Sequence, residues 1–201
     1  APCILVGTQM LAKGHHFANI TLVAVLDADS GLMSPDFRSH ERLGQLLTQV
    51  AGRCGRGTMP GKVILQTHQP DHPLLDVLTQ QNYSDYSKLL RKQRRQSELP
   101  PYKQLVLIRA DAAHAQNAEA FLQSARQCAE AIFPSGETVN YLGPLPALME
   151  RRNSRHRYVL QISGGRRSDL NVLLSQLVFE LEKLPMARHV RWGVDVDPQE
   201  L

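Results

Sequence analysis

The segment Arg157-Tyr-Val-Leu-Gln-Ile-Ser163 carries the clearest structural pattern in the second half of the chain. Tyr158, Leu160 and Ile162 recur at every second position, and this period is typical of a β-strand with one buried face. A strand of this kind needs neighbouring strands and a layer of structure to cover its apolar face. The segments on either side of it therefore decide the architecture.

Those segments alternate between strand and helix patterns. We expect strands at 103–109, 138–142 and 190–196, and helices at 113–132 and 169–184. The order is then strand, helix, strand, strand, helix, strand. This order matches a ferredoxin-like α+β sandwich.

The first half of the chain has a different pattern. Residues 21–26 and 62–67 are apolar, rich in β-branched side chains and typical of buried strands. A helix from Pro35-Asp36 to Val50 lies between them, so we expect a parallel α/β arrangement. We also expect a short strand at 4–7, one helical turn at 8–14 and a loop at 27–31.

A helical stretch from His72 to about Ser97 follows, and Leu99-Pro100-Pro101-Tyr102 ends it. We place a domain boundary there and predict two domains, residues 1–99 and residues 100–201. The chain has 201 residues and 42% hydrophobic residues, which is enough for two small cores. It opens into a strand-like run without Met, so we expect it to be part of a longer protein.

Composition excludes some classes of protein. No apolar run approaches the roughly 20 residues of a membrane span. The three cysteines, Cys3, Cys54 and Cys128, are far apart and form no CxxC pair, so we predict neither a zinc site nor a disulfide framework. His68 and His72 could bind a metal from one helix face, but Pro70 between them favours a loop. We predict no metal site in this chain.

The net charge is only +4, but the positive residues are clustered. Arg151, Arg152, Arg155 and Arg157 surround Asn153-Ser154, a pair that favours a turn. A basic turn of this kind suits a polyanion, and phosphate contacts give weak sequence preference. The alternative is a solvated loop. A second basic cluster lies at residues 88–95.

The segment Gln49-Val-Ala-Gly-Arg-Cys-Gly-Arg-Gly57 has two arginines, each following a glycine. Arginine presents a planar fork to phosphate oxygens, and an arginine supplied across an interface can stabilise a transferred phosphoryl group. The chain has no phosphate-binding loop, because Arg56 and Val63 stand where a glycine and a hydroxyl are required. We therefore expect no ATP hydrolysis by this chain alone. A simple basic turn is the alternative.

Two motifs together resemble those of superfamily-two helicases. Gln49-x-x-Gly-Arg-x-Gly-Arg56 is similar to the last motif of the second RecA-like lobe, and Thr8-Gln-Met-Leu-Ala-Lys-Gly-His-His16 to the motif before it. Leu-Asp-Ala-Asp29, Gln-Thr-His-Gln-Pro70 and the closing Asp195-Val-Asp-Pro198 are closer still to the primosomal protein N′ family of replication-restart helicases. The resemblance spans essentially the whole chain.

The resemblance implies the C-terminal part of the second RecA-like helicase lobe, followed by a ferredoxin-like α+β C-terminal domain. It implies an ATP-dependent 3′-to-5′ DNA helicase that recognises abandoned replication forks and restarts replication by primosome assembly. Arg53, Arg56 and Gln49 would be catalytic, Gly14 and Gly52 would lie at the nucleotide, and Thr8, Gln9, Lys13, Arg151, Arg152, Arg155 and Arg157 would contact DNA. His16 departs from the pattern, since many of these helicases have Asp there.

The same resemblance implies the cofactors and partners. ATP and Mg would be bound mainly by a first lobe that this chain lacks, and the zinc of the full-length family would lie outside this chain. Partners would be forked and single-stranded DNA, other primosome proteins and single-stranded-DNA-binding protein, with Arg166 and Arg167 on the partner surface. The location would be the bacterial cytoplasm, in association with the nucleoid. A non-catalytic nucleic-acid-binding or protein-interaction module is the alternative.

Overall fold

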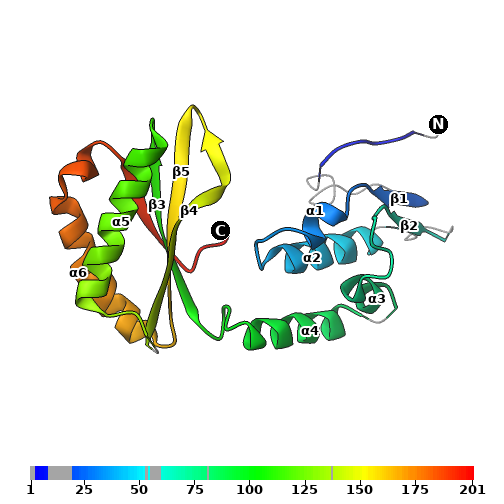
Figure 1. Ribbon diagram of the computed structural model, residues 1–201. Helices are drawn as coiled ribbons and strands as arrows, with labels where there is room; N and C mark the ends of the chain where they lie inside the picture. Colours follow the sequence, from blue (N-terminus) through cyan, green and yellow to red (C-terminus); the bar gives the residue numbers. More distant parts are fainter. Residues whose placement is uncertain (1–2, 9–19, 53, 55–59, 81, 137) are drawn as a thin grey trace. The chain divides into compact units, whose positions relative to one another are not determined.

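The chain forms two compact units, Ala1–Gln93 and Arg94–Leu201 (Figure 1). The computed structural model describes residues 3–8, 20–52, 54, 60–80, 82–136 and 138–201. The limit between the units falls inside helix α4 (Tyr83–Gln96), whereas the sequence places a domain boundary between residues 99 and 100. That boundary stays a prediction.

The described residues of unit 1 form a two-stranded parallel sheet and four helices. The elements are β1 (Leu22–Val25), α1 (Asp29–Leu32), α2 (Ser39–Ala51), β2 (Lys62–Leu65), α3 (Pro73–Gln80) and α4. Leu22 pairs with Lys62 and Val25 with Leu65, so the two strands run in parallel, as predicted. The core of the unit consists of Leu32, Leu43, Leu47, Leu74, Leu75, Tyr86 and Leu90. These residues come from the four helices, which the core holds together.

The strand predicted at 4–7 is wrong. Residues 3–8 have no regular structure in the part of the chain that is described, and Ile4 and Val6 are 91% and 90% exposed. A strand exists only through hydrogen bonds to a neighbour, and β1 and β2 pair with each other instead. Apolar character alone therefore does not make this segment a strand. The helical turn predicted at 8–14 lies outside the described residues, except for Thr8.

Two other predictions in unit 1 need correction. The loop predicted at 27–31 contains the start of α1, a single helical turn. The single helix predicted from His72 to Ser97 is two helices, α3 and α4. Asn82 begins the second one, since its side-chain oxygen accepts the backbone N–H of Asp85 at 3.1 Å and its amide donates to the Asp85 carboxylate at 2.9 Å. This reciprocal cap starts a new helix.

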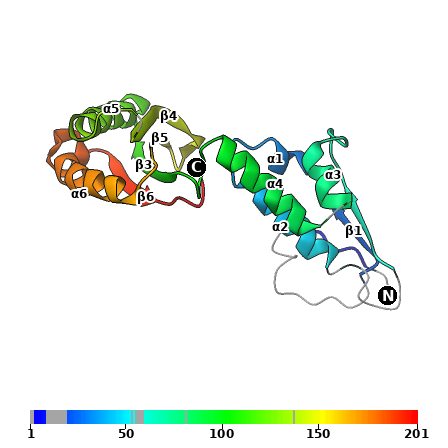
Figure 2. The ribbon, with the colours of Figure 1, turned by 90° about the horizontal axis from the view of Figure 1, so that it is seen from below.

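Unit 2 is a four-stranded antiparallel sheet with two helices. The elements are β3 (Gln104–Ala112), α5 (Ala115–Ile132), β4 (Val139–Arg152), β5 (Arg155–Gly164), α6 (Arg167–Lys183), a short 3₁₀ helix at Pro185–Arg188 and β6 (Arg191–Val196). The strand order is β4-β5-β3-β6, and every neighbouring pair is antiparallel. Helices α5 and α6 lie together on one face of the sheet (Figure 2). The predicted ferredoxin-like order is confirmed.

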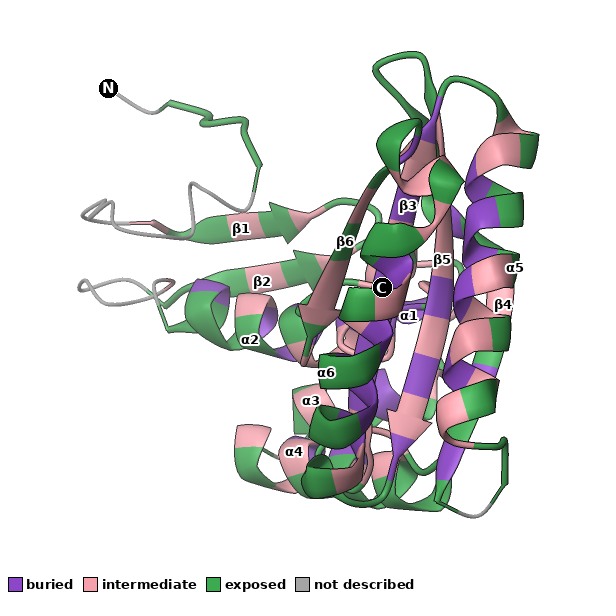
Figure 3. Ribbon diagram, turned by 90° about the vertical axis from the view of Figure 1, so that its left-hand side faces the viewer, coloured by how far each residue is buried: buried purple, intermediate pink, exposed green. Residues whose placement is uncertain are grey.

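The core of unit 2 lies between the sheet and the helices. Val106 and Ile108 of β3 and Leu160 and Ile162 of β5 point into it from alternate positions and are at most 1% exposed. The helices contribute Phe121 and Leu177 among other buried residues, so purple segments line the facing sides in Figure 3. Burial of each such side chain stabilises the fold by about 1.5–3 kcal/mol relative to exposure. The alternation seen in the sequence thus fixes which strand face is covered.

Candidate nucleic-acid interface

The β4–β5 hairpin ends in a turn formed by Asn153 and Ser154. Both residues have positive φ angles, 50° and 58°, and Arg152 pairs with Arg155 directly across the turn. A two-residue loop with positive φ at both positions is a type I′ turn, whose twist matches that of the flanking strands. The backbone therefore fixes the register of the arginines on both sides of the turn.

Three arginines near this turn are exposed. Arg152 and Arg155 lie opposite each other on one face of the hairpin, while Arg151 pairs with His156 on the other face. Like charges directly opposite on two strands repel. Within the described part of the chain, Arg151 and Arg152 have no acidic partner. An anion bound between Arg152 and Arg155 would relieve the repulsion between their guanidinium groups.

Arg157 differs from the other three arginines. Its Nε lies 3.4 Å from the Oδ1 of Asp111 on β3, and both side chains are about three-quarters buried. Arg155 also donates from Nη1 to the backbone oxygen of Asp111 at 3.3 Å. Asp111 therefore neutralises much of the Arg157 charge and positions this end of the hairpin. This pairing could not be predicted from the sequence, because Asp111 and Arg157 are far apart in the chain and come together only through the pairing of β3 with β5.

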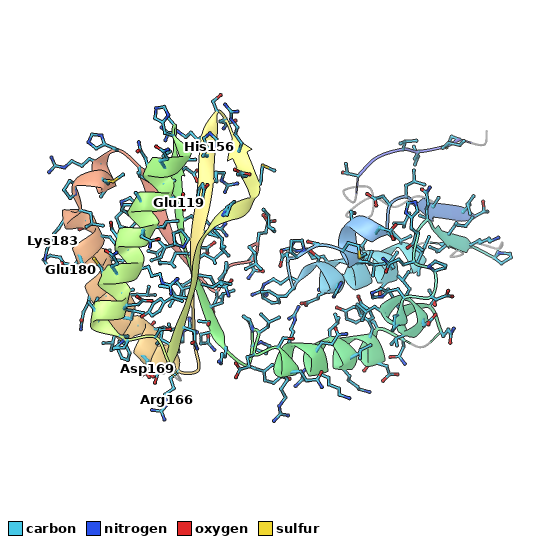
Figure 4. The ribbon with its side chains drawn as sticks, in the orientation of Figure 1. Glu119, His156, Arg166, Asp169, Glu180 and Lys183 are labelled. Atoms are coloured by element: carbon cyan, nitrogen blue, oxygen red, sulfur yellow. The ribbon has the colours of Figure 1, made fainter. Side chains whose placement is uncertain are left out.

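Arg166 and Arg167 lie away from this cluster. They begin α6, and Arg167 Nη2 is 3.4 Å from Asp197 while its side chain stays 67% exposed. Strand β5 separates them from the hairpin turn, and ten residues of strand span about 30 Å. Figure 4 shows His156 near one end of unit 2 and Arg166 at the other. The two arginine groups are therefore separate surfaces.

The predicted nucleotide site is described only in part. Gln49 is exposed in the last turn of α2, and the N–H of Gly52 donates to Thr48 O at 3.0 Å as that helix ends. Thr8 is exposed. The remaining predicted residues, Gln9, Lys13, Gly14, Arg53 and Arg56, lie outside the described residues. Cys54 Sγ donates to the backbone oxygen of Lys62 at 3.4 Å, so Cys54 lies beside the beginning of β2.

A polar cluster joins α1 to the residues that follow β2. The Asp29 carboxylate accepts hydrogen bonds from the Thr67 hydroxyl, from the backbone N–H of His68 at 2.9 Å and from His68 Nδ1 at 2.7 Å. These bonds, above all the one from Thr67, lower the pKa of Asp29 to about 2. The carboxylate thus ties α1 to the end of β2 and has a structural role.

Within the residues whose structure is described, no group of three or more His, Cys, Asp or Glu side chains could hold a metal ion. No helix in the same ranges has the length and apolar character required to cross a bilayer.

The strand order and helix layer place unit 2 in the class of ferredoxin-like α+β domains, with a basic hairpin at one end. The family model described as the primosomal protein N C-terminal domain matches residues 95–199, so the chain belongs to this family.

Three curated relatives are similar along almost the whole chain, and each is called replication restart protein PriA. The chain is 42% identical to the protein of Haemophilus influenzae, 40% to that of a Synechocystis species and 36% to that of Bacillus subtilis. The matches cover 98%, 97% and 97% of this chain and 27%, 23% and 24% of the relatives. The chain therefore spans about a quarter of their length.

Proposed function

We propose that this chain is the C-terminal part of an ATP-dependent 3′-to-5′ DNA helicase that recognises abandoned replication forks and restarts replication by primosome assembly. Membership of the primosomal protein N family supports the proposal, as do relatives named for replication restart. Unit 1 would be part of the second RecA-like lobe. The domain from residue 100 to 201 would bind DNA and partners.

The observation that carries the DNA-binding part of this proposal is the exposed arginine pair across the hairpin turn. Arg152 and Arg155 face each other, and Arg151 lies on the opposite face. Guanidinium groups bind phosphate oxygens through two parallel hydrogen bonds, so a DNA backbone is a matching anion. Arg157 would mainly support the hairpin through Asp111 and contribute less to the phosphate contacts.

A salt titration of fork binding tests this part of the proposal. In the 201-residue chain, replacement of Arg151, Arg152 and Arg155 by Ala should weaken binding to forked DNA. It should also flatten the slope of log K against log salt by roughly two to three units, because each phosphate contact contributes about 0.9. The matched control replaces the same three residues with Lys, which keeps the charge and should keep the slope. An unchanged slope in the alanine variant would exclude the phosphate contacts.

The nucleotide side of the proposal concerns the complete helicase. Arg53 and Arg56 would reach ATP and Mg bound by the first lobe, with Gln49, Gly14 and Gly52 beside them, while Thr8, Gln9 and Lys13 would contact DNA. Arg56→Ala should lower the ATPase rate by about 10³–10⁵, as expected for an arginine finger, and should largely spare DNA binding. Near-normal turnover in this variant would contradict the assignment.

The partner side of the proposal rests on Arg166 and Arg167. They form a surface separate from the hairpin and would receive single-stranded-DNA-binding protein, while other primosome proteins would bind elsewhere on the complete helicase. Loss of binding to single-stranded-DNA-binding protein in the double variant Arg166→Ala/Arg167→Ala, with unchanged DNA binding, would support the assignment of these two arginines.

The zinc of the complete helicase would be held outside this chain. The protein would act in the bacterial cytoplasm at the nucleoid.

A further inference from the structure

Strand β4 has a large bulge just before the hairpin turn. Pro146 pairs with Tyr158 and Arg151 pairs with His156, so residues 147–150 all lie opposite the single residue Arg157. Figure 1 shows this part of β4 bowed away from β5. A bulge redirects the side chains that it carries. The residues of this bulge therefore differ in their surroundings from those of the paired strand.

The bulge presents two large apolar side chains to solvent. Ala147 is buried and anchors its beginning, whereas Leu148 and Met149 are 56% and 57% exposed. Single exposed apolar residues are ordinary, but two consecutive ones on a bulge require a reason. The core of unit 2 does not need them, because neither residue belongs to it. They lie in sequence directly before the exposed Arg151 and Arg152, with only Glu150 between.

We infer that Leu148 and Met149 contact unstacked bases at the junction of forked DNA, while the arginines of the turn hold the adjoining phosphates. This inference rests on the proposed function and specifies the part of the DNA that the hairpin contacts. Leu and Met side chains are known wedges between base steps when arginines hold the neighbouring backbone. Bases at a junction are already partly unpaired, so unstacking them costs less than in a duplex.

The arrangement of charge favours DNA over an acidic apolar peptide. Arg152 and Arg155 lie on one face of the hairpin and Arg151 on the other. A single bound peptide would use the cations of one face. Two DNA strands that diverge around the turn can use both faces, with the apolar bulge between them. Because the wedge is aliphatic, it makes no aromatic stacking contact, and the sequence preference should be weak.

The first test uses forked DNA with 2-aminopurine at the junction, since this base gains fluorescence when it is unstacked. Binding of the 201-residue chain should raise the fluorescence, and Leu148→Ser/Met149→Ser should abolish that gain. This variant should keep the salt slope of binding, because its arginines are intact, and lose roughly tenfold or less in affinity. The matched control is Leu142→Ser, which removes an apolar side chain of β4 with 54% exposure outside the bulge.

The second test needs no substitution. Met149 and Met33 are similarly exposed, at 57% and 61%, so both should oxidise readily in the free chain. Saturating forked DNA should protect Met149 more strongly than blunt duplex of the same length does. Met33, which lies in unit 1, is the internal reference. Protection of Met149 by an acidic apolar peptide, with none by forked DNA, would make the bulge a peptide-binding surface and overturn the inference.

The outcomes separate this inference from the proposed function. A fluorescence gain that survives in Leu148→Ser/Met149→Ser overturns the base contact, even where the arginine-to-alanine variant still flattens the salt slope. An unchanged slope in the arginine variant overturns the phosphate contacts on which the inference rests. If Leu148→Ser/Met149→Ser loses the fluorescence gain and keeps the salt slope of binding, both the base contact and the phosphate contacts are supported.

Discussion

At the scale of single residues, Gly44 shows how tightly α2 packs in unit 1. A Cβ added to Gly44 would lie 2.3 Å from Cε1 of Tyr86, which is fully buried. The Tyr86 hydroxyl donates to the backbone oxygen of His40 at 2.5 Å, and burial raises the pKa of this hydroxyl far above its usual value. The ring is thus held at both ends and cannot move away from a larger residue.

We therefore predict that Gly44→Ala destabilises the chain. A glycine in a helix interior is normally less favourable than Ala by about 0.5–1 kcal/mol, so a stabilising effect would be expected from helix propensity alone. Here overpacking against Tyr86 should instead lower the free energy of unfolding by about 1–3 kcal/mol. Urea unfolding measures the change. Gly165→Ala is the control, since nothing lies within 4 Å of its added Cβ, and it should have little effect. A stabilised Gly44→Ala variant would refute the packing.

A second residue-scale prediction concerns acid stability. The pKa of Asp29 is lowered from 3.8 to about 2 by hydrogen bonds from Thr67 and His68. A carboxyl group whose pKa is lower in the folded state stabilises the fold above the unfolded pKa, and this contribution is lost as pH falls through the folded value. Asp29→Asn should therefore lower the melting temperature at pH 7, and the difference from the parent chain should shrink between about pH 4 and pH 2.

Thermal unfolding at a series of pH values measures this effect. Asp71→Asn is the control at pH 7, because Asp71 is exposed. A deficit in Asp29→Asn that stays constant down to pH 2 would show that the effect is not electrostatic. From the sequence, Asp29 was expected only to lie in a loop at residues 27–31. Its partners, Thr67 and His68, follow the other strand, and only parallel pairing of β1 and β2 brings them together.

At the scale of elements, the hairpin turn combines a favourable and an unfavourable residue. Asn153 and Ser154 both adopt positive φ, a region that costs most residues other than glycine about 1–2 kcal/mol and that Asn tolerates best. We predict that Ser154→Gly raises the free energy of unfolding by about 0.5–1 kcal/mol, since part of the gain is offset by the freer unfolded chain.

Chemical unfolding of the 201-residue chain measures this gain, and Ser154→Ala is the control. Alanine keeps the steric cost of positive φ and should give no stabilisation. If both substitutions had the same effect, the turn would not have the type I′ geometry. Fork binding should be unchanged in either variant, because neither removes an arginine.

The same scale shows what the sequence could and could not predict. Alternation in residues 157–163 predicted β5, and the Asn-Ser pair predicted the turn. Strand β4 was expected to end at Leu142, yet it continues to Arg152 through Pro144 and Pro146. Proline is tolerated there because β4 is an edge strand and its outward N–H groups need no partner. The exposed apolar bulge of β4 could not be predicted from the sequence either. The exposure of its side chains depends on the pairing register of β4 with β5 and not on residue type.

The break between α3 and α4 has a local signal in the sequence, namely the residues that cap the start of α4. Residues 72–97 have acidic residues early and basic residues late, and this charge distribution is typical of one helix with a favourable dipole. Asn82 followed three residues later by Asp85 is the pattern of a helix start, and these two side chains do cap α4. Local capping chemistry was therefore the better guide to helix ends than charge distribution over the whole stretch.

At the scale of the whole molecule, the two units differ in the size of their cores. The core of unit 2 is drawn from strands β3 to β6 and helices α5 and α6, all of them within residues 94–201. Among the described residues of unit 1, the core cluster has seven buried members, while Leu22 of β1 and Leu26 just after it are 55% and 71% exposed. Apolar burial is the main favourable term in folding, so the two units should differ in stability.

Our last prediction is that residues 94–201 fold as an independent unit. A domain of roughly 100 residues should unfold cooperatively with an enthalpy of about 60–80 kcal/mol near 60 °C. Calorimetry of the 201-residue chain should show two transitions, and the isolated segment should reproduce the one at higher temperature.

Two substitutions test whether the transitions belong to separate units. Leu160→Ala, in the core of unit 2, should lower the midpoint temperature of the upper transition alone, because removal of a buried leucine side chain costs about 2–5 kcal/mol. Leu47→Ala, in the core of unit 1, should lower only the other. A single transition that both substitutions shift equally would mean that the units unfold together.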